Sequence, residues 1–250
     1  MQLREKKISI IICIKNHYRY LNQALNSIKK QNYKNLEIII CLKNVNNRKF
    51  NLDKQFNFNF KIFIQKKEGL YDAINQSLKK SSGEIIFILH PDNLIINKNL
   101  FKKVNQIFTL QKIKILFSNL LIVKEKNIHK IVRRWVNPKF QKELLNHGWT
   151  PPHPTIFYSS KTAKKFKYNE KYKISADYDL LIRILKTTSE IKIFNLNTYS
   201  VAMRNNGIST KKKMVFLKFY EDYLVLKNNN YKYPLFVILY KILKKIRQFF

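Results

Sequence analysis

Carboxylates are the scarcest charged groups in this sequence, so their positions are the first guide to its chemistry. The chain has 15 acidic residues against 49 lysines and arginines. Asp92 follows an apolar run that ends at Leu89, where a carboxylate can hold a hard cation such as Mg²⁺ or Mn²⁺. Asp177 and Asp179 open a predicted helix. On spacing alone, the pair is either a helix cap whose carboxylates interact favourably with the dipole, or a general base with a neighbour on the same helix.

Further polar residues follow other apolar runs or precede helices. Lys15 and Asn16 follow the run 8–14. Asp72 lies at the start of a helical segment, where it is either a site residue or only a helix cap. His90 is either a metal ligand that replaces a missing carboxylate or a hydrogen-bonded structural residue. The sequence has no glycine-rich phosphate loop of the dinucleotide or P-loop type. A bound nucleotide would therefore be held by side chains, by strand-end amides and by any metal ion present.

The elements that position these residues alternate between strands and helices. Short β-branched runs predict buried strands, and apolar residues at helical spacing predict helices. This alternation predicts a mainly parallel α/β sheet whose ligands bind at the carboxyl ends of the strands. The predicted strands are 8–14, 36–42, 60–65, 84–89, 114–123 and 191–196, the helices are 20–31, 71–80, 176–186 and 233–250, and a hairpin-like stretch to 136 and a proline-rich loop at 149–154 lie between them.

Seven segments, taken in order, resemble the family 2 glycosyltransferases that assemble bacterial surface polysaccharides and lipopolysaccharide. The resemblance covers about residues 8–210, and it rests on the order of the segments more than on any one of them. The segments are ISIIICIKN (8–16), ALNSIKKQNY (24–33) with LEIII (36–40), EGLYDAIN (68–75), SGEIIFIL (82–89), PHPT (152–155), SADYDLL (175–181) and GIST (207–210).

The resemblance implies a GT-A fold and the transfer of a hexose from a nucleotide-sugar donor with inversion at the anomeric carbon. Residues 1–95 would form the nucleotide-binding half, 96–210 the acceptor half, and 211–250 a helical extension. The acceptor would be a surface glycan or a lipid-linked sugar, and a divalent metal, Mg²⁺ or Mn²⁺, is the implied cofactor. By position, Asp177 would be the general base, Lys15, Asn16, Asp72 and Asp92 would bind the donor, Asp92 and Asn93 the metal, and Trp149, His153 and Asp179 would line the acceptor side.

Two positions depart from the family pattern. Leu42 stands where the second strand normally ends in the aspartate that holds the nucleotide base, and Asn93 replaces the second carboxylate of the metal motif. An asparagine carbonyl can ligate Mg²⁺, but it brings no charge. His153 can also serve only to stiffen a loop between two prolines. These departures leave open the alternative of a catalytically impaired pseudoenzyme or scaffold.

The basic character of the chain bears on its partners. The net charge is +34, but 41 of the 49 basic residues are lysines spread along the sequence, which indicates a compositional bias and argues against nucleic acid as a partner. The predicted helix 233–250 interleaves lysines with apolar residues, so it either packs on its own domain or binds an anionic membrane surface. Cys13 and Cys41 are predicted to be free core thiols. The expected location is the cytoplasm, peripheral to the inner face of the cell membrane.

Overall fold

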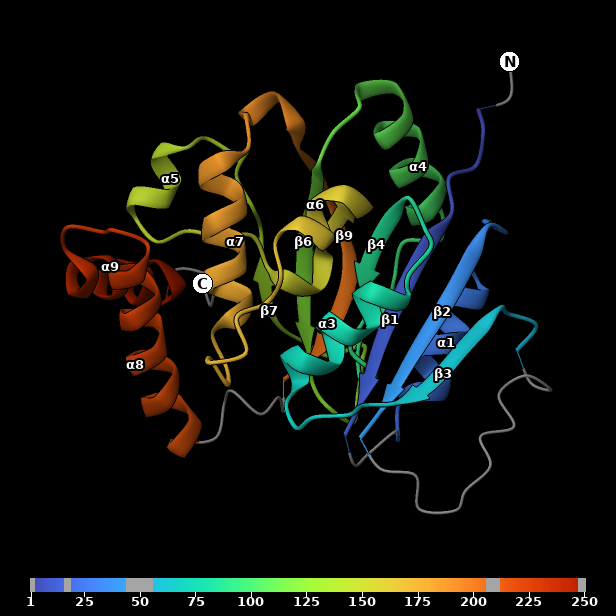
Figure 1. Ribbon diagram of the computed structural model, residues 1–250, viewed down its shortest axis with the longest axis horizontal. Helices are drawn as coiled ribbons and strands as arrows, with labels where there is room; N and C mark the ends of the chain where they lie inside the picture. The colour runs from blue at the N-terminus through green and yellow to red at the C-terminus, as the bar shows by residue number, and fades with distance from the viewer. Residues whose placement is uncertain (1–2, 16–18, 44–55, 206–211, 247–250) are drawn as a thin grey trace.

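The centre of the molecule is a nine-stranded sheet with the order β3-β2-β1-β4-β8-β6-β9-β5, and β7 pairs with β6 (Figure 1). The computed structural model describes residues 3–15, 19–43, 56–205 and 212–246. The strands are β1 Ile8–Ile14, β2 Leu36–Leu42, β3 Phe60–Ile64, β4 Ile85–Ile88, β5 Leu94–Ile95, β6 Ile115–Val123, β7 Ile131–Trp135, β8 Phe157–Ser159 and β9 Ile193–Arg204. The helices are α1 Leu21–Lys29, α3 Leu70–Lys80, α4 Leu100–Gln111, α5 Glu143–Asn146, α6 Ser160–Lys165, α7 Ala176–Thr187, α8 Lys212–Asn228 and α9 Pro234–Ile246, with single 3₁₀ turns η1 His153–Thr155 and η2 Glu190–Lys192.

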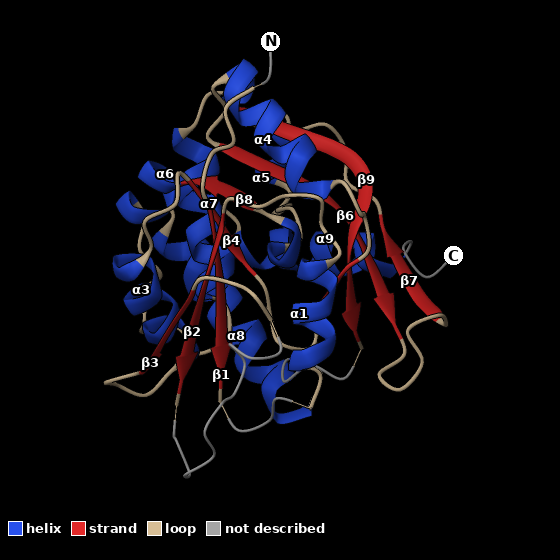
Figure 2. Cartoon of the chain, turned by 90° about the vertical axis from the view of Figure 1, so that its right-hand side faces the viewer, coloured by secondary structure: helices blue, strands red, loops and turns tan. Residues whose placement is uncertain are grey.

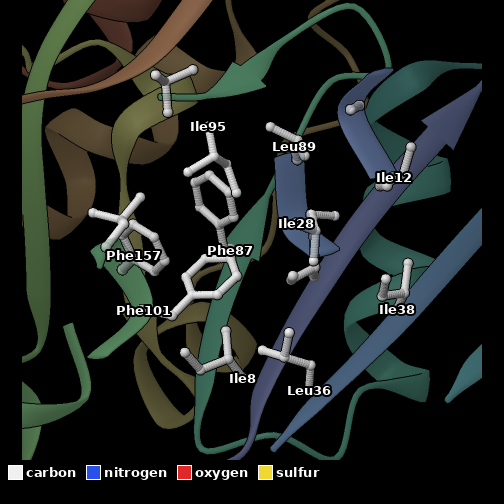
Figure 3. Packing of buried hydrophobic residues seen from close by; sticks show 14 of the residues in the cluster. Ile8, Ile12, Ile28, Leu36, Ile38, Phe87, Leu89, Ile95, Phe101 and Phe157 are labelled. Carbon is white, nitrogen blue, oxygen red and sulfur yellow. The ribbon is translucent and has the colours of Figure 1, made fainter. Parts of the chain in front are cut away.

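Both faces of the sheet are buried, as the unbroken apolar strands predict. Ile10 and Ile12 of β1 point into a core with α1 and α4, whereas Ile11 points into a second core with α3 and α7. Figure 3 shows the first of these cores, in which Phe87 of β4 stacks on Phe157 of β8 with ring centroids 4.3 Å apart. A strand whose successive residues enter two different cores is apolar on both faces, and in β1 and β2 only Ser9 and Glu37, which hydrogen-bond each other, depart from this pattern.

The first four strands of the sheet, β3, β2, β1 and β4, are parallel, and the predicted strands and helices of residues 8–89 are confirmed. Their carboxyl ends lie along one edge, which is the lower edge in Figure 2. Residues 15, 43 and 90 each follow one of these strands. The fold thus brings the predicted donor-side residues to a single edge.

The short strand β8 joins the second half of the chain to the first. It runs antiparallel to β4, with Phe87 opposite Phe157 and Ile85 opposite Ser159. Residues that precede β8 therefore lie beside residues that follow β4. This register places η1, which contains His153, next to the end of β4, which leads to His90.

The strand predicted at 191–196 is longer than expected. β9 continues to Arg204, although Asn197 has a left-handed backbone with φ of 44°. The pairing of β9 with β6 shifts register between Phe117 and Leu120, so an irregularity absorbs the kink and the ladder resumes. The predicted strand ended too early because the polar residues around Asn197 are typical of a strand end.

Helices α8 and α9 pack against α7 at the side of the sheet (Figure 1). Val225, Leu226, Val237 and Ile238 of these helices belong to the same buried cluster as Leu180 of α7. Strands from before and after residue 95 belong to the same sheet. The division of the chain at 95 and 210 therefore stays a prediction. No helix within the described residues is both long enough and apolar enough to cross a bilayer.

Candidate active site

Basic residues lie at the carboxyl ends of β1 and β2. Lys15 follows β1 and is exposed, and Lys43 follows β2 and forms an ion pair of 2.9 Å with Glu68. The hydrogen bond and the charge of Lys43, together with the charge of Lys15, lower the pKa of Glu68. Asn16 lies outside the described residues. This edge therefore presents lysines where a diphosphate would bind.

Asp72 and Leu42 lie near the same edge of the sheet. Asp72 is buried in the first turn of α3, accepts a hydrogen bond from Gln76 and interacts electrostatically with the Cys41 thiol of β2. Leu42, at the end of β2, is buried in the first core, so this strand end offers no carboxylate to a nucleotide base. The cysteines Cys13 and Cys41 are free thiols opposite each other in β1 and β2, as expected.

The turn after β4 contains a buried amide without a partner. Asn93 is fully buried, its backbone N–H donates to the His90 carbonyl at 3.0 Å, and neither polar atom of its side chain has a hydrogen-bond partner within the described structure. An unpaired buried polar group costs on the order of 1–3 kcal/mol, which a bound ligand would offset. Asn93 directly follows Asp92 in the sequence, and an amide oxygen and a carboxylate are both ligands that suit a hard divalent cation.

The residues present fit such a cation only as a partial set of ligands. Among the described residues no group of three or more histidine, cysteine, aspartate or glutamate side chains could hold a metal ion by itself. Mg²⁺ and Mn²⁺ sites of this kind commonly complete their coordination with water and substrate phosphates. Asp92 and Asn93 therefore suit a cation that arrives with, or is completed by, a diphosphate.

Arg204, at the end of β9, holds this turn in place. Its guanidinium donates to the backbone carbonyl of Asp92, to the Glu125 carbonyl at 3.0 Å and to the Gln23 side chain. It also lies over the ring of Tyr20, 4.0 Å from the centroid. A planar fork of donors is required to reach three acceptors in different directions, and only arginine supplies it.

Asp177 begins α7 and belongs to an aromatic cluster. Its Oδ1 accepts the Tyr178 N–H at 2.8 Å and lies 3.4 Å from the Tyr71 hydroxyl, which donates to the Ile174 carbonyl. The ring of Tyr71 stacks on that of Tyr168, with centroids 5.4 Å apart. The carboxylate is half-buried, so it is held by named contacts without being sealed from a substrate.

His153 connects this cluster to the end of β4. His153 Nε2 and the Tyr168 hydroxyl are 2.6 Å apart, and the His153 and His90 rings lie 6.1 Å apart. Burial lowers the pKa of His153 to about 4, partly opposed by the charge of Asp177, so the imidazole is neutral at pH 7. A chain of contacts thus runs from Asp177 through Tyr71, Tyr168 and His153 to His90, which begins the turn with Asp92.

Trp149 and Asp179 lie in other surroundings. Trp149 packs against Phe117 and Phe140, with ring centroids 5.7 and 6.1 Å away. Asp179 is buried, and Arg183 Nε donates to its Oδ2 at 2.8 Å while Asn229 Nδ2 donates to its Oδ1 at 3.1 Å. These contacts are structural, and the acceptor-side role of both residues stays a prediction.

Three residues of this region were not predicted from the sequence. Tyr168, Arg204 and Glu221 carry contacts that hold His153, the Asp92 turn and the segment before Asp177. Arg204 is one of eight arginines and Glu221 one of few acids, so their scarcity was a signal. Their targets, however, lie far away in the sequence, and no local pattern indicates them.

Comparisons with known proteins point to one family. The family model for glycosyl transferase family 2 matches residues 9–170. An uncharacterized glycosyltransferase of Methanocaldococcus jannaschii is 30% identical over 228 residues, which cover 85% of this chain and 77% of that protein. One of Rickettsia typhi is 25% identical over 194 residues, and the match spans 73% of this chain but only 59% of that protein.

Solved structures share the fold at low sequence identity. S. aureus TarS has a TM-score of 0.68 at 16% identity, over 90% of this chain and 40% of that chain. The mannosyltransferase PcManGT from Pyrobaculum calidifontis has a TM-score of 0.56 at 11% identity, over 88% of this chain and 62% of that chain. The fold is therefore GT-A, as the resemblance implied. Since the family model covers more than half of the sequence, this chain belongs to glycosyl transferase family 2 and is a glycosyltransferase.

Proposed function

We propose that this glycosyltransferase moves a hexose from a nucleotide-sugar donor to a hydroxyl group of a surface glycan or lipid-linked acceptor, with inversion and with Asp177 as general base. The observation that carries the proposal is the chain of contacts between Asp177 and the turn that contains Asp92. It holds a carboxylate close to the strand ends where the donor is expected to bind. Structures of S. aureus TarS with UDP-GlcNAc and of PcManGT with GDP-Man and Mn²⁺ support a nucleotide-sugar donor.

The proposed reaction is a single displacement. The acceptor oxygen attacks the anomeric carbon from the face opposite the diphosphate, and its proton passes to a carboxylate oxygen of Asp177. The bond from the anomeric carbon to the diphosphate oxygen breaks, and the diphosphate leaves with the electron pair. One displacement on one carbon inverts its configuration. The neutral imidazole of His153 adds no charge beside the base.

The donor would be bound mainly at the edge formed by β1, β2 and β4. Lys15 offers a cation to the diphosphate, and Asp72, at the start of α3, lies below the same edge. Asp92 and Asn93 would hold a divalent cation, Mg²⁺ or Mn²⁺, which when bound offsets the negative charge of the leaving diphosphate. The buried, unpaired Asn93 amide is the observation that supports this assignment.

A donor panel with and without Mn²⁺ tests the proposed activity. We expect one UDP-, GDP- or dTDP-sugar to raise the melting temperature and to release nucleoside diphosphate on incubation. Asp177→Asn should keep the donor-induced shift and lose turnover by at least about 10²-fold, because general bases typically contribute 10²–10⁴-fold. Glu190→Gln is the control, since Glu190 accepts a backbone N–H from Lys142, outside this cluster. Full turnover by Asp177→Asn would exclude Asp177 as the base.

A pseudoenzyme or scaffold is the second candidate function. It is favoured by Leu42, which is buried where the family has a carboxylate, and by the uncharged Asn93. A pseudoenzyme of this kind would show no turnover with any donor and no donor-induced rise in melting temperature.

We also propose that the outer face of α9 binds an anionic membrane surface, where a lipid-linked acceptor would be presented. Helix α9 packs inward through Val237 and Ile238, yet Phe236, Leu239 and Leu243 are 72, 55 and 63% exposed on its other side. An apolar helix face of this size left in water indicates an interaction site. Exposed Lys232 and Lys244, and Phe216 of α8 at 80% exposure, add the charge and further apolar surface that anionic lipid favours.

Vesicle sedimentation tests this location. Wild-type protein should bind phosphatidylglycerol-containing vesicles and bind pure phosphatidylcholine vesicles weakly, because the headgroup charge is part of the attraction. The double variant Phe236→Ser, Leu239→Ser should lose most of this binding. Leu110→Ser is the matched control, because Leu110 is a 60% exposed leucine on α4. If vesicles are not bound and light scattering shows a dimer that the double variant disrupts, a second copy covers this face instead.

A further inference from the structure

Helix α8 contains a pair of adjacent buried carboxylates, Glu221 and Asp222. Buried carboxylates are rare unless they are paired with cations or hydrogen-bond donors. This chain has only 15 acidic residues and a net charge of +34, so two adjacent buried carboxylates need an explanation. Both contact the segment that leads into α7 and Asp177.

Glu221 accepts hydrogen bonds from three successive backbone N–H groups. Lys173 N donates to its Oε1 at 2.8 Å, while Ile174 N and Ser175 N donate to its Oε2 at 2.8 and 2.9 Å. Hydrogen bonds to an ionised acceptor are about twice as strong as neutral ones. Asp177 is only two residues further along, so one carboxylate fixes the backbone from which the base is displayed.

The same segment is held from the opposite side by α3. The carbonyl of Ile174 accepts the hydrogen bond of the Tyr71 hydroxyl, and that hydroxyl lies 3.4 Å from Asp177 Oδ1. Glu221 therefore binds the N–H groups of this segment and Tyr71 one of its carbonyl groups. Together, Glu221 and Tyr71 hold both the N–H groups and a carbonyl group of this segment, so they fix the position of its backbone.

Asp222 holds the residue at the N-terminal cap of α7. Ser175 occupies that cap position, but its hydroxyl donates to Asp222 Oδ1 at 2.6 Å and does not cap its own helix. Burial favours the neutral acid, but the charges of Lys241 and Lys218 outweigh it and keep the pKa of Asp222 below its usual value. The carboxylate is therefore ionised at neutral pH, and Lys241 ties α9 to the same point at 3.0 Å.

We propose that Glu221 is a positioning residue for the transfer reaction: it holds the Lys173–Ser175 backbone so that Asp177 faces the acceptor hydroxyl. The inference rests on the proposed role of Asp177 as general base. Placement matters because a displacement of about 1 Å from the reactive geometry can lower a rate about 10²-fold. Helix α8 then contributes to catalysis through the backbone segment that Glu221 holds.

The test separates placement of the base from binding of the donor. In Glu221→Gln the amide nitrogen would face one of the three N–H groups and lose that hydrogen bond, while the side chain keeps its size. We expect kcat for the donor that turns over in the panel to fall about tenfold to a hundredfold. The dissociation constant of that donor, measured by calorimetry, should stay within about twofold, because the donor edge is formed by β1, β2 and β4.

Hydrogen exchange and a matched control complete the design. The amides of residues 173–175 should exchange faster in Glu221→Gln, with protection of β1 and β4 unchanged. Glu190→Gln also removes a carboxylate that accepts a backbone N–H, in this case of Lys142 at 2.7 Å, and should keep wild-type kcat. Circular dichroism checks that both variants fold.

Each other outcome overturns the inference in a recognisable way. Wild-type kcat in Glu221→Gln, or an equal loss of kcat in Glu190→Gln, shows that Glu221 serves stability alone. A loss of donor affinity with unchanged kcat shows that it supports the donor site instead. If Asp177→Asn is inactive while Glu221→Gln is fully active, only this inference fails. If no donor turns over, or if Asp177→Asn is active, the proposed function fails and the inference fails with it.

Discussion

At the residue scale, a buried carboxylate lies at the amino ends of the parallel strands, and the candidate site lies at their carboxyl ends. Glu37, at the start of β2, is fully buried and accepts hydrogen bonds from Ser9 of β1 and from the backbone N–H groups of Ser82 and Gly83 before β4. Lys61 of β3 lies 2.9 Å away. One side chain therefore ties four parallel strands together at the edge remote from the chemistry.

The stability of this junction depends on pH. Burial would raise the pKa of Glu37, but the hydrogen bonds from Ser9, Lys61 and Ser82 lower it from 4.5 to about 2. The ionised group therefore stabilises the fold fully above pH 4.5, and the stabilisation, about 3 kcal/mol, is lost as the pH falls towards 2. Glu37→Gln should lower the free energy of unfolding at pH 7 by about 2–4 kcal/mol and make it less sensitive to acid.

Urea denaturation of the wild type and the variant across the acid range measures both effects. The two free energies of unfolding should converge as the pH falls below 4.5. Curves that stay parallel from neutral pH to acid would show that Glu37 is not the titrating group.

Gly83 shows how tightly this junction is packed. A Cβ atom at this position would lie 2.5 Å from Ser9 Oγ, 2.7 Å from Ser9 N and 2.8 Å from the Lys7 carbonyl oxygen. Two of these atoms belong to the backbone, so they cannot turn away. We expect Gly83→Ala to cost about 1–3 kcal/mol of stability and to lower the melting temperature by several degrees. A melting temperature within one degree of wild type would mean that β1 and β4 separate easily.

At the scale of elements, the end of β9 is tied to the turn after β4. Arg204 binds the Asp92 carbonyl, and both strands end at the side of the sheet where the donor is expected. Arg204→Lys keeps the charge but cannot reach several acceptors at once. We expect it to weaken nucleoside diphosphate binding about tenfold, because the Asp92 turn would be held less firmly. Calorimetry measures this, and an unchanged dissociation constant would show that the turn holds its shape without the guanidinium.

The tail helices have two different faces. Their inner face holds the segment before Asp177 through Glu221 and Asp222, and the outer face of α9 is apolar. Hydrophobic burial against Leu180 and its neighbours keeps them on the body of the molecule. Truncation after residue 210 should therefore destabilise the remaining chain as well as remove the proposed membrane surface.

At the scale of the whole molecule, the net charge of +34 should make vesicle binding sensitive to salt. Attraction between exposed lysines and anionic lipid is screened over a Debye length of about 8 Å at physiological ionic strength and about 3 Å at 1 M. We expect binding to phosphatidylglycerol vesicles to fall at least tenfold over that range. Sedimentation with increasing NaCl measures it. Binding that salt leaves unchanged would mean that apolar insertion alone holds the protein.

Local pattern predicted the parallel strands and the helix of Asp177 well. Ile8–Ile14 and Leu36–Leu42 are found with the predicted bounds, because runs of β-branched residues have few other stable structures. Helix α8 was not predicted, since its apolar side chains are distributed around the helix and form no single stripe. The three-residue strand β8 is too short to carry a pattern, although it places η1 beside β4.

The sequence by itself determined the alternation of strands and helices, the scarcity of carboxylates and the candidate residues Asp92 and Asp177, because each depends on residue type or on short-range spacing. Only the tertiary structure decided which of them meet. The contacts of Asp177 with Tyr71, of His153 with Tyr168 and of Glu221 with the segment before α7 join residues that local periodicity does not relate. Such contacts arise when the strands pair and the cores pack, since burial draws together any apolar surfaces that fit, whatever their distance along the chain.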